Sequence, residues 1–83
     1  MDYDPDQVDE ATLALLYLGT TELPGGGGRA WRGLDLQTLA RLQQKGWIGP
    51  PSSKSISLDI TPAGLRKMKE CFQARFAPAP PDA

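Results

Sequence analysis

Few side chains in this 83-residue sequence have the types and spacing that catalysis requires. There is no histidine, so the commonest general base and metal ligand is absent. The single cysteine, Cys71, falls among lysines and arginines, which favour a thiolate, but no histidine is available to activate it. We therefore interpret Cys71 as a packing residue and expect the protein not to be an enzyme.

A cluster of carboxylates near the N-terminus is the candidate cation site, because oxygen ligands attract hard divalent cations. The cluster lacks the glycine and the spaced final glutamate of a calcium-binding loop. Helix capping and solvation explain it better, so we expect no metal site and no cofactor. Its members are Asp2, Asp4, Asp6, Asp9 and Glu10.

Residues suited to nucleic-acid recognition gather in the middle of the chain. Arg41 and Lys45 are four residues apart on a predicted helix, and arginine and glutamine are side chains that read base edges. Lys54 falls in a predicted wing, residues 49–55, where a phosphate contact is expected. The alternative is a polar helix face that is merely solvated. The candidate nucleic-acid-binding residues are Arg32, Gln37, Arg41, Gln44, Lys45 and Lys54.

The charge is unevenly distributed, although the net charge is only -1. Residues 1–24 carry six acidic side chains and no base, whereas residues 25–77 carry all nine lysines and arginines against three acids. Such asymmetry indicates an anionic partner, of which duplex DNA is the obvious example. The competing explanation is that the acidic and basic segments pair within the fold.

A second candidate site is apolar. Leu65, Met68, Phe72 and Phe76 are spaced by three, four and four residues, which places them on one face of a predicted helix. If the first helix covers one flank of that face, then Met68, Phe72 and Phe76 remain for self-association or for another protein. The alternative is that all of these side chains belong to the core.

The first half of the chain predicts one helix and one strand. A helix over residues 5–18 is expected, with Asp4 as its cap and Gly19 as its end. The glycine run at residues 25–28 predicts a mobile loop, because glycine loses most backbone entropy inside an element. A short edge strand over residues 29–33 should follow, with Trp31 pointing into the core.

The second half predicts a helix, a hairpin and a last helix. Asp35 caps a helix over residues 36–45, whose buried side should carry Leu36, Leu39, Ala40 and Leu42. A short strand at residues 47–48 and an alternating strand over residues 56–60 flank a proline-rich turn. Thr61 caps the third helix. The predicted core comprises Leu15, Leu39, Leu42, Ile48, Leu58, Leu65 and Phe72.

These elements make one domain, residues 1–77, followed by a disordered proline-rich tail at residues 78–83. No apolar run approaches the roughly 18 residues of a membrane span, so we expect no membrane partner. A lone cysteine fits the reducing cytoplasm. The predicted fold class is α+β and winged-helix-like, with three helices and a small antiparallel hairpin or sheet.

The sequence resembles a small uncharacterised bacterial family, a domain of unknown function with a winged-helix-like core. The resemblance rests on several short segments and covers nearly all of residues 2–76, but it implies no established activity. At the level of fold, residues 60–64 also resemble the helix start that follows the wing in winged-helix regulators. The segments are Val8-Asp9, residues 13–18, residues 30–35, Leu39 with Leu42, residues 45–48, and Thr61 with Gly64-Leu65.

Two functions follow from these patterns. The first is a small non-enzymatic binding module, a DNA-binding regulator or accessory factor that uses helix 36–45 and wing 49–55. The second is a protein-interaction module with no nucleic-acid role, either a homodimer or a binder of another protein. A full helix-turn-helix has one more helix before the wing, and residues 24–33 supply a glycine loop instead.

Overall fold

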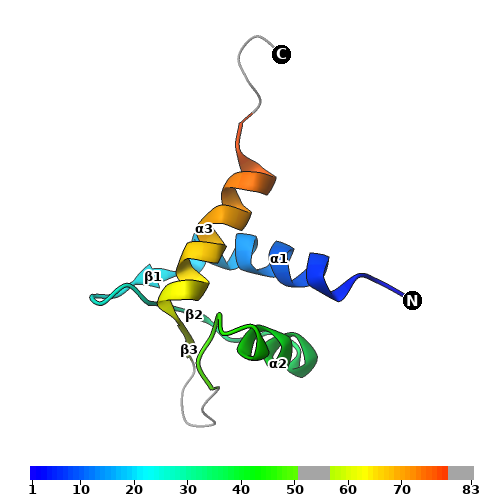
Figure 1. Cartoon of the computed structure of the whole chain (residues 1–83), viewed down its shortest axis with the longest axis horizontal. Helices are drawn as coiled ribbons and strands as arrows, with labels where there is room; N and C mark the ends of the chain where they lie inside the picture. Colours follow the sequence, from blue (N-terminus) through cyan, green and yellow to red (C-terminus); the bar gives the residue numbers. More distant parts are fainter. Residues whose placement is uncertain (51–56, 79–83) are drawn as a thin grey trace.

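The computed structural model describes residues 1–50 and 57–78. In these residues three α-helices pack with a small three-stranded antiparallel sheet, so the predicted α+β class is confirmed (Figure 1). Helix α3 crosses α1, and its C-terminal half projects beyond the other elements (Figure 1). The elements are α1 (Pro5–Leu16), the 3-10 turn η1 (Tyr17–Gly19), β1 (Thr21–Glu22), β2 (Gly28–Trp31), α2 (Leu36–Gln44), β3 (Ser57–Ile60) and α3 (Pro62–Phe76).

The three helices begin where the capping residues predict. Asp4 Oδ1 accepts a hydrogen bond from the backbone N–H of Asp6 at 2.9 Å. Thr61 Oγ1 accepts one from the N–H of Gly64, also at 2.9 Å. Asp35 caps α2 in the same way. These side chains satisfy N–H groups that have no partner within the helix, which fixes where each helix starts.

The sheet is ordered β1-β2-β3, with both pairings antiparallel. Strand β2 is therefore central, and the prediction of an edge strand at residues 29–33 is wrong. Gly28 pairs with Ile60 and Trp31 with Ser57. The predicted strand at residues 47–48 is reduced to one bridge, between Ile48 and Ile60. The predicted wing, residues 49–55, falls mostly outside the described residues, as does the tail beyond residue 78.

The glycine run forms a hairpin turn and part of a strand, so the prediction that no element would contain it is wrong. Gly25 and Gly26 have backbone φ angles of 100° and 94°, which residues with a Cβ rarely adopt. Gly28 lies inside β2, where a Cβ would come within 2.9 Å of Thr20 Cγ2. Close approach of neighbouring chain, rather than flexibility, explains glycine at this position.

The core lies between the helices and one face of the sheet. Five of the seven predicted core residues are buried there: Leu39, Leu42, Ile48, Leu58 and Leu65. The fully buried side chains of the core include Leu13 and Met68 as well.

Several apolar side chains expected inside are exposed instead. Leu15 is 59% exposed and Trp31 is 66% exposed, while Phe72 is only half-buried. Trp31 faces outward because β2 alternates, with Gly28 and Ala30 taking the inner positions. Leu36 and Ala40, expected on the buried side of α2, are also exposed. Among the described residues, no helix has the length and apolarity that crossing a membrane requires.

Candidate functional site

Arg41 of α2 and Lys45, the residue that caps the C-terminus of α2, both reach toward α1. Arg41 Nε lies 2.9 Å from Asp9 Oδ1 and 3.1 Å from Asp9 Oδ2. Lys45 Nζ lies 2.7 Å from Asp9 Oδ2 and 2.8 Å from Asp6 Oδ1. The Asp9 side chain is fully buried between these two cations. Two candidate nucleic-acid contacts are therefore engaged in a charge cluster that joins α1 to α2.

Helix geometry explains why this cluster forms. Arg41 and Lys45 are four residues apart on α2, and Asp6 and Asp9 are three apart on α1, so each pair lies on one helix face. Arg41 Nη2 also donates to Thr38 Oγ1 at 3.1 Å, which fixes the guanidinium further. The prediction that capping and solvation explain Asp6 and Asp9 is wrong for Asp9, which is fully buried. The sequence did offer one signal for Asp9. Its three-residue spacing from Asp6 places both carboxylates on one face of the helix.

The pKa values of the cluster follow from its hydrogen bonds and charges. The hydrogen bond from Lys45, together with its positive charge, lowers the pKa of Asp6 below its ordinary value. Partial burial opposes the charged form of Lys45, but hydrogen bonds to Asp6 and Asp9 outweigh that effect and raise its pKa. Asp6 and Lys45 therefore stay charged at neutral pH.

Other acids of the N-terminal segment are paired in the same manner. Lys67 Nζ lies 3.9 Å from Glu10 Oε1, and Lys69 Nζ lies 2.7 Å from Glu22 Oε1. The acidic and basic segments thus pair within the fold, which was one of the two explanations of the charge asymmetry. The Lys69–Glu22 pair is exposed to solvent, and the half-buried Lys67–Glu10 pair is long at 3.9 Å, so both contribute little to stability.

The remaining candidate nucleic-acid residues are spread over the surface. Gln37 and Gln44 are exposed on α2, and Arg32 is half-buried in the connection between β2 and α2. Lys54 lies outside the described residues. A nucleic-acid contact stays a prediction. To make such a contact, Arg41 and Lys45 would have to break their ion pairs with the aspartates of α1.

The three candidate self-association residues divide between core and surface. Met68 is fully buried, which removes it from any surface that this fold presents. Phe72 is half-buried and Phe76 is 47% exposed. Ring centroids lie 5.1 Å apart between Tyr17 and Phe72 and 5.3 Å apart between Phe72 and Phe76. We call these three rings the aromatic ladder; it leads from η1 to the exposed end of α3.

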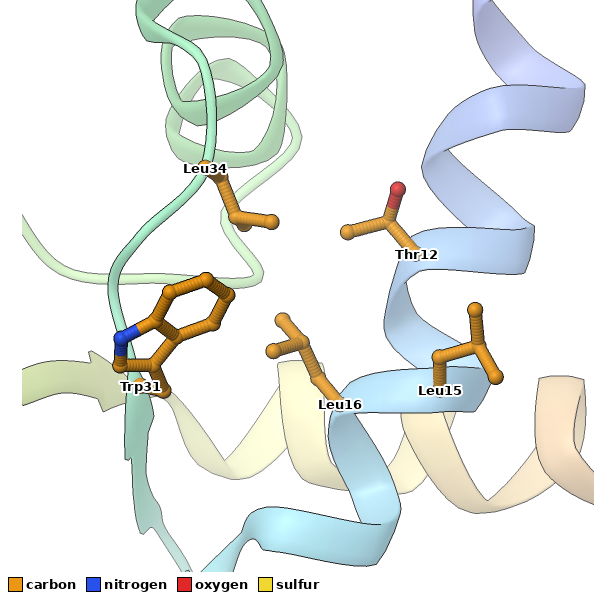
Figure 2. Close-up of a pocket in the computed structure, with 5 residues that line it drawn as sticks. All are labelled: Thr12, Leu15, Leu16, Trp31 and Leu34. Carbon is orange, nitrogen blue, oxygen red and sulfur yellow. The ribbon is translucent and has the colours of Figure 1, made fainter.

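An open apolar pocket of about 320 Å³ lies between α1 and the chain that links β2 to α2 (Figure 2). In Figure 2 the ring of Trp31 and the side chain of Leu34 face Leu16 and Thr12 across a gap. We call this hollow the Trp31 pocket; it is lined by Thr12, Leu15, Leu16, Trp31 and Leu34. The sequence does not predict this pocket, because its pattern places Leu15 and Trp31 in the core, whereas both are exposed.

The lining of the Trp31 pocket suits binding rather than catalysis. Thr12 is its one polar side chain, and the Thr12 hydroxyl donates to the carbonyl of Val8 at 2.7 Å. Among the residues that the structure describes, no acidic, basic or cysteine side chain lines it. Cys71 is buried elsewhere, and burial raises the pKa of its thiol, which disfavours the reactive thiolate. The pocket can therefore accept an apolar side chain.

Comparison with known proteins gives a relative and a family without an assigned function. A family model described as "Domain of unknown function (DUF6429)" matches residues 4–78. "Uncharacterized protein y4hR" of Sinorhizobium fredii (strain NBRC 101917 / NGR234) is 41% identical over 76 residues, which are 92% of this chain and 97% of the relative. No solved structure matches the chain. The resemblance to a family of unknown function is thus confirmed.

Proposed function

This chain belongs to the DUF6429 family, a domain of unknown function, and on that premise we propose that it is a small non-enzymatic protein-interaction module. Its partner is a second copy of the same chain, and the Trp31 pocket is the contact surface. The observation that carries this proposal is an apolar pocket left uncovered beside an exposed tryptophan. The lone cysteine is consistent with a cytoplasmic location.

Uncovered apolar area favours association. Leu15 and Trp31 expose more than half of their surface to water, at 59% and 66%. Burying a leucine or an aromatic side chain completely contributes about 1.5–3 kcal/mol, so burying the exposed part of each contributes roughly half of that. Tryptophan is also among the residues that dominate binding energy at interfaces.

A second copy is favoured as the partner by the size of the contact. A stable interface removes about 800 Å² from each partner, and this chain exposes 5704 Å² in all. The pocket alone is smaller than that. In a two-fold dimer a residue i that meets j on the other copy is matched by j meeting i, so each copy buries the pocket and also the surface that meets the partner's pocket.

The test is a measurement of molar mass against concentration by light scattering, from micromolar to millimolar protein. We expect a monomer–dimer equilibrium that Leu15→Glu shifts toward monomer by about tenfold or more in dissociation constant. Leu36→Glu is the matched control, because Leu36 is 81% exposed and does not line the pocket. A monomer at every concentration, or equal effects of the two variants, would refute the proposal.

Nucleic-acid binding by a winged-helix-like domain is the second candidate. Arg29 and Trp31 lie on the same outward face of β2, and both are exposed. An exposed arginine on an outward strand face favours contact with a phosphate of the duplex. Each phosphate contact adds about -0.9 to the slope of log affinity against log salt on duplex DNA. Arg29→Ala should therefore flatten that slope by about 0.9, and absence of duplex binding at low salt would exclude this candidate.

A further inference from the structure

We infer that the Trp31 pocket of one copy receives the Phe76 ring of the other, and that the exchange is reciprocal. This inference rests on the proposed function, because it names the segment that fills the proposed contact surface. It joins two apolar features that the monomer leaves unmatched, a hollow and a projecting ring.

The end of α3 presents an exposed aromatic ring to a partner. Its C-terminal half projects beyond the other elements (Figure 1), and every side chain over residues 73–77 is exposed. Phe76 remains 47% exposed there, so about half of the surface of this side chain is available to a partner. The Phe72 ring, 5.3 Å away in an edge-on contact, limits the orientations of Phe76.

The pocket has room and lining for a phenyl ring. A cavity of about 150 Å³ lined by apolar side chains is enough to bind benzene, and the Trp31 pocket measures about 320 Å³. The Trp31 indole supplies an aromatic wall, and Leu16 and Leu34 supply aliphatic walls. Aromatic pairs prefer offset or edge-on contact, which an open pocket permits.

The apolar area that a stable homodimer buries also requires both the Trp31 pocket and the Phe76 ring. A homodimer interface is about 65% apolar, so about 500 Å² of each copy's 800 Å² would be apolar. Leu15 and Trp31 at the pocket and Phe76 at the end of α3 are among the large exposed side chains, at roughly 100 Å² each. The pocket by itself falls well short of the total. The projecting ring and the half-buried side chains around both features add further apolar area.

Disulfide trapping tests the contact directly. Phe76→Cys and Leu15→Cys proteins are mixed under mild oxidation, and the cross-linked heterodimer is measured by non-reducing electrophoresis. The native Cys71 is buried, which keeps it from competing. Ala74→Cys replaces Phe76→Cys in the control, because residue 74 is exposed on the same helix but points in another direction. We expect about tenfold more heterodimer with Phe76→Cys than with Ala74→Cys.

Complementation separates reciprocal exchange from a face-to-face pairing of two pockets. Trp31→Asp removes the pocket but keeps the projecting ring, and Phe76→Ser does the reverse. Each variant alone should dimerise at least tenfold more weakly, which corresponds to about 1.4 kcal/mol. A mixture restores one intact contact, so its dimer fraction should exceed that of either variant. Circular dichroism confirms that both exposed-site variants fold.

The outcomes distinguish the two proposals. If the natural chain stays monomeric, both fail. If it dimerises and Leu15→Glu weakens the dimer, but the mixture is no better than its components and the Phe76→Cys trap equals its control, then the proposed function survives and the Phe76 exchange is refuted. In the double variant Leu15→Cys and Phe76→Cys, which carries both thiols on one chain, cross-linked species beyond dimer refute a closed two-fold exchange, because open head-to-tail contacts do not close.

Discussion

A buried carboxylate decides the arrangement of the two N-terminal helices. Asp9 is fully buried, and both of its oxygens are occupied by Arg41 and Lys45 at 2.7–3.1 Å. Burying a charge is costly unless hydrogen bonds and an opposite charge compensate for it. The helix-to-helix contact is therefore specified by charge as well as by apolar packing.

Replacing Asp9 by asparagine should destabilise the protein by about 1–3 kcal/mol, because the buried cluster loses a charge while both cations remain. Urea unfolding monitored by circular dichroism measures the change. Asp2→Asn is the matched control, since Asp2 is exposed, and should alter stability by less than about 0.5 kcal/mol. A loss equal to that of the control would show that Asp9 is not a structural residue.

At the scale of elements, helix caps and close backbone contacts set the positions of the helices. Thr61 caps α3 and also donates to the carbonyl of Gly46 at 2.7 Å, which ties the start of α3 to the end of α2. Gly64 brings that first turn of α3 against the backbone of Trp47, and a Cβ on Gly64 would collide with the Trp47 carbonyl. The contact between the start of α3 and the chain that follows α2 thus depends on the absence of a side chain at Gly64.

Gly64→Ala should lower stability by about 1–3 kcal/mol, the usual cost of forcing extra volume into a packed site. The sign is informative, because glycine to alanine within a helix normally stabilises by roughly 0.5–1 kcal/mol. Thermal or urea unfolding measures it. Gly19→Ala meets nothing within 4 Å and serves as the control. A stabilised Gly64→Ala protein would contradict the close contact.

At the scale of the whole molecule, the acidic and basic segments hold each other through ion pairs, so stability should depend on pH. Lys45 lowers the pKa of Asp6, and a hydrogen bond from Thr38 lowers the pKa of Asp35. Both carboxyls bind protons more weakly in the folded than in the unfolded chain. Their contribution is therefore present above the ordinary aspartate pKa of 3.8 and is lost as the pH falls through the lower folded values.

The contribution of these two carboxyls to the free energy of unfolding should therefore be constant above about pH 5. It should decrease as the pH falls below about 4. The double variant Asp6→Asn and Asp35→Asn should show a smaller difference between pH 6 and pH 3 than the natural chain. Urea midpoints at the two pH values measure this. An unchanged difference would show that neither carboxyl contributes to the acid sensitivity.

The sequence by itself determined the local elements. Asp4, Asp35 and Thr61 cap their helices because capping depends on residues within one turn. The alternation of Leu58 and Ile60 with polar neighbours gave β3 for the same reason, and most predicted core leucines are buried. The α+β class follows from the order of these elements.

Only the tertiary structure decided which face of each element meets another. Whether Trp31 points inward depends on the central place of β2 in the sheet, and whether Leu15 is covered depends on how far α1 stands from the β2–α2 link. The partners of Asp9 are 32 and 36 residues away in the chain. The spacing of Asp6 and Asp9 indicates that they share a helix face but not what lies across from it, so the Trp31 pocket and the charge cluster became visible only when the helices were placed in space.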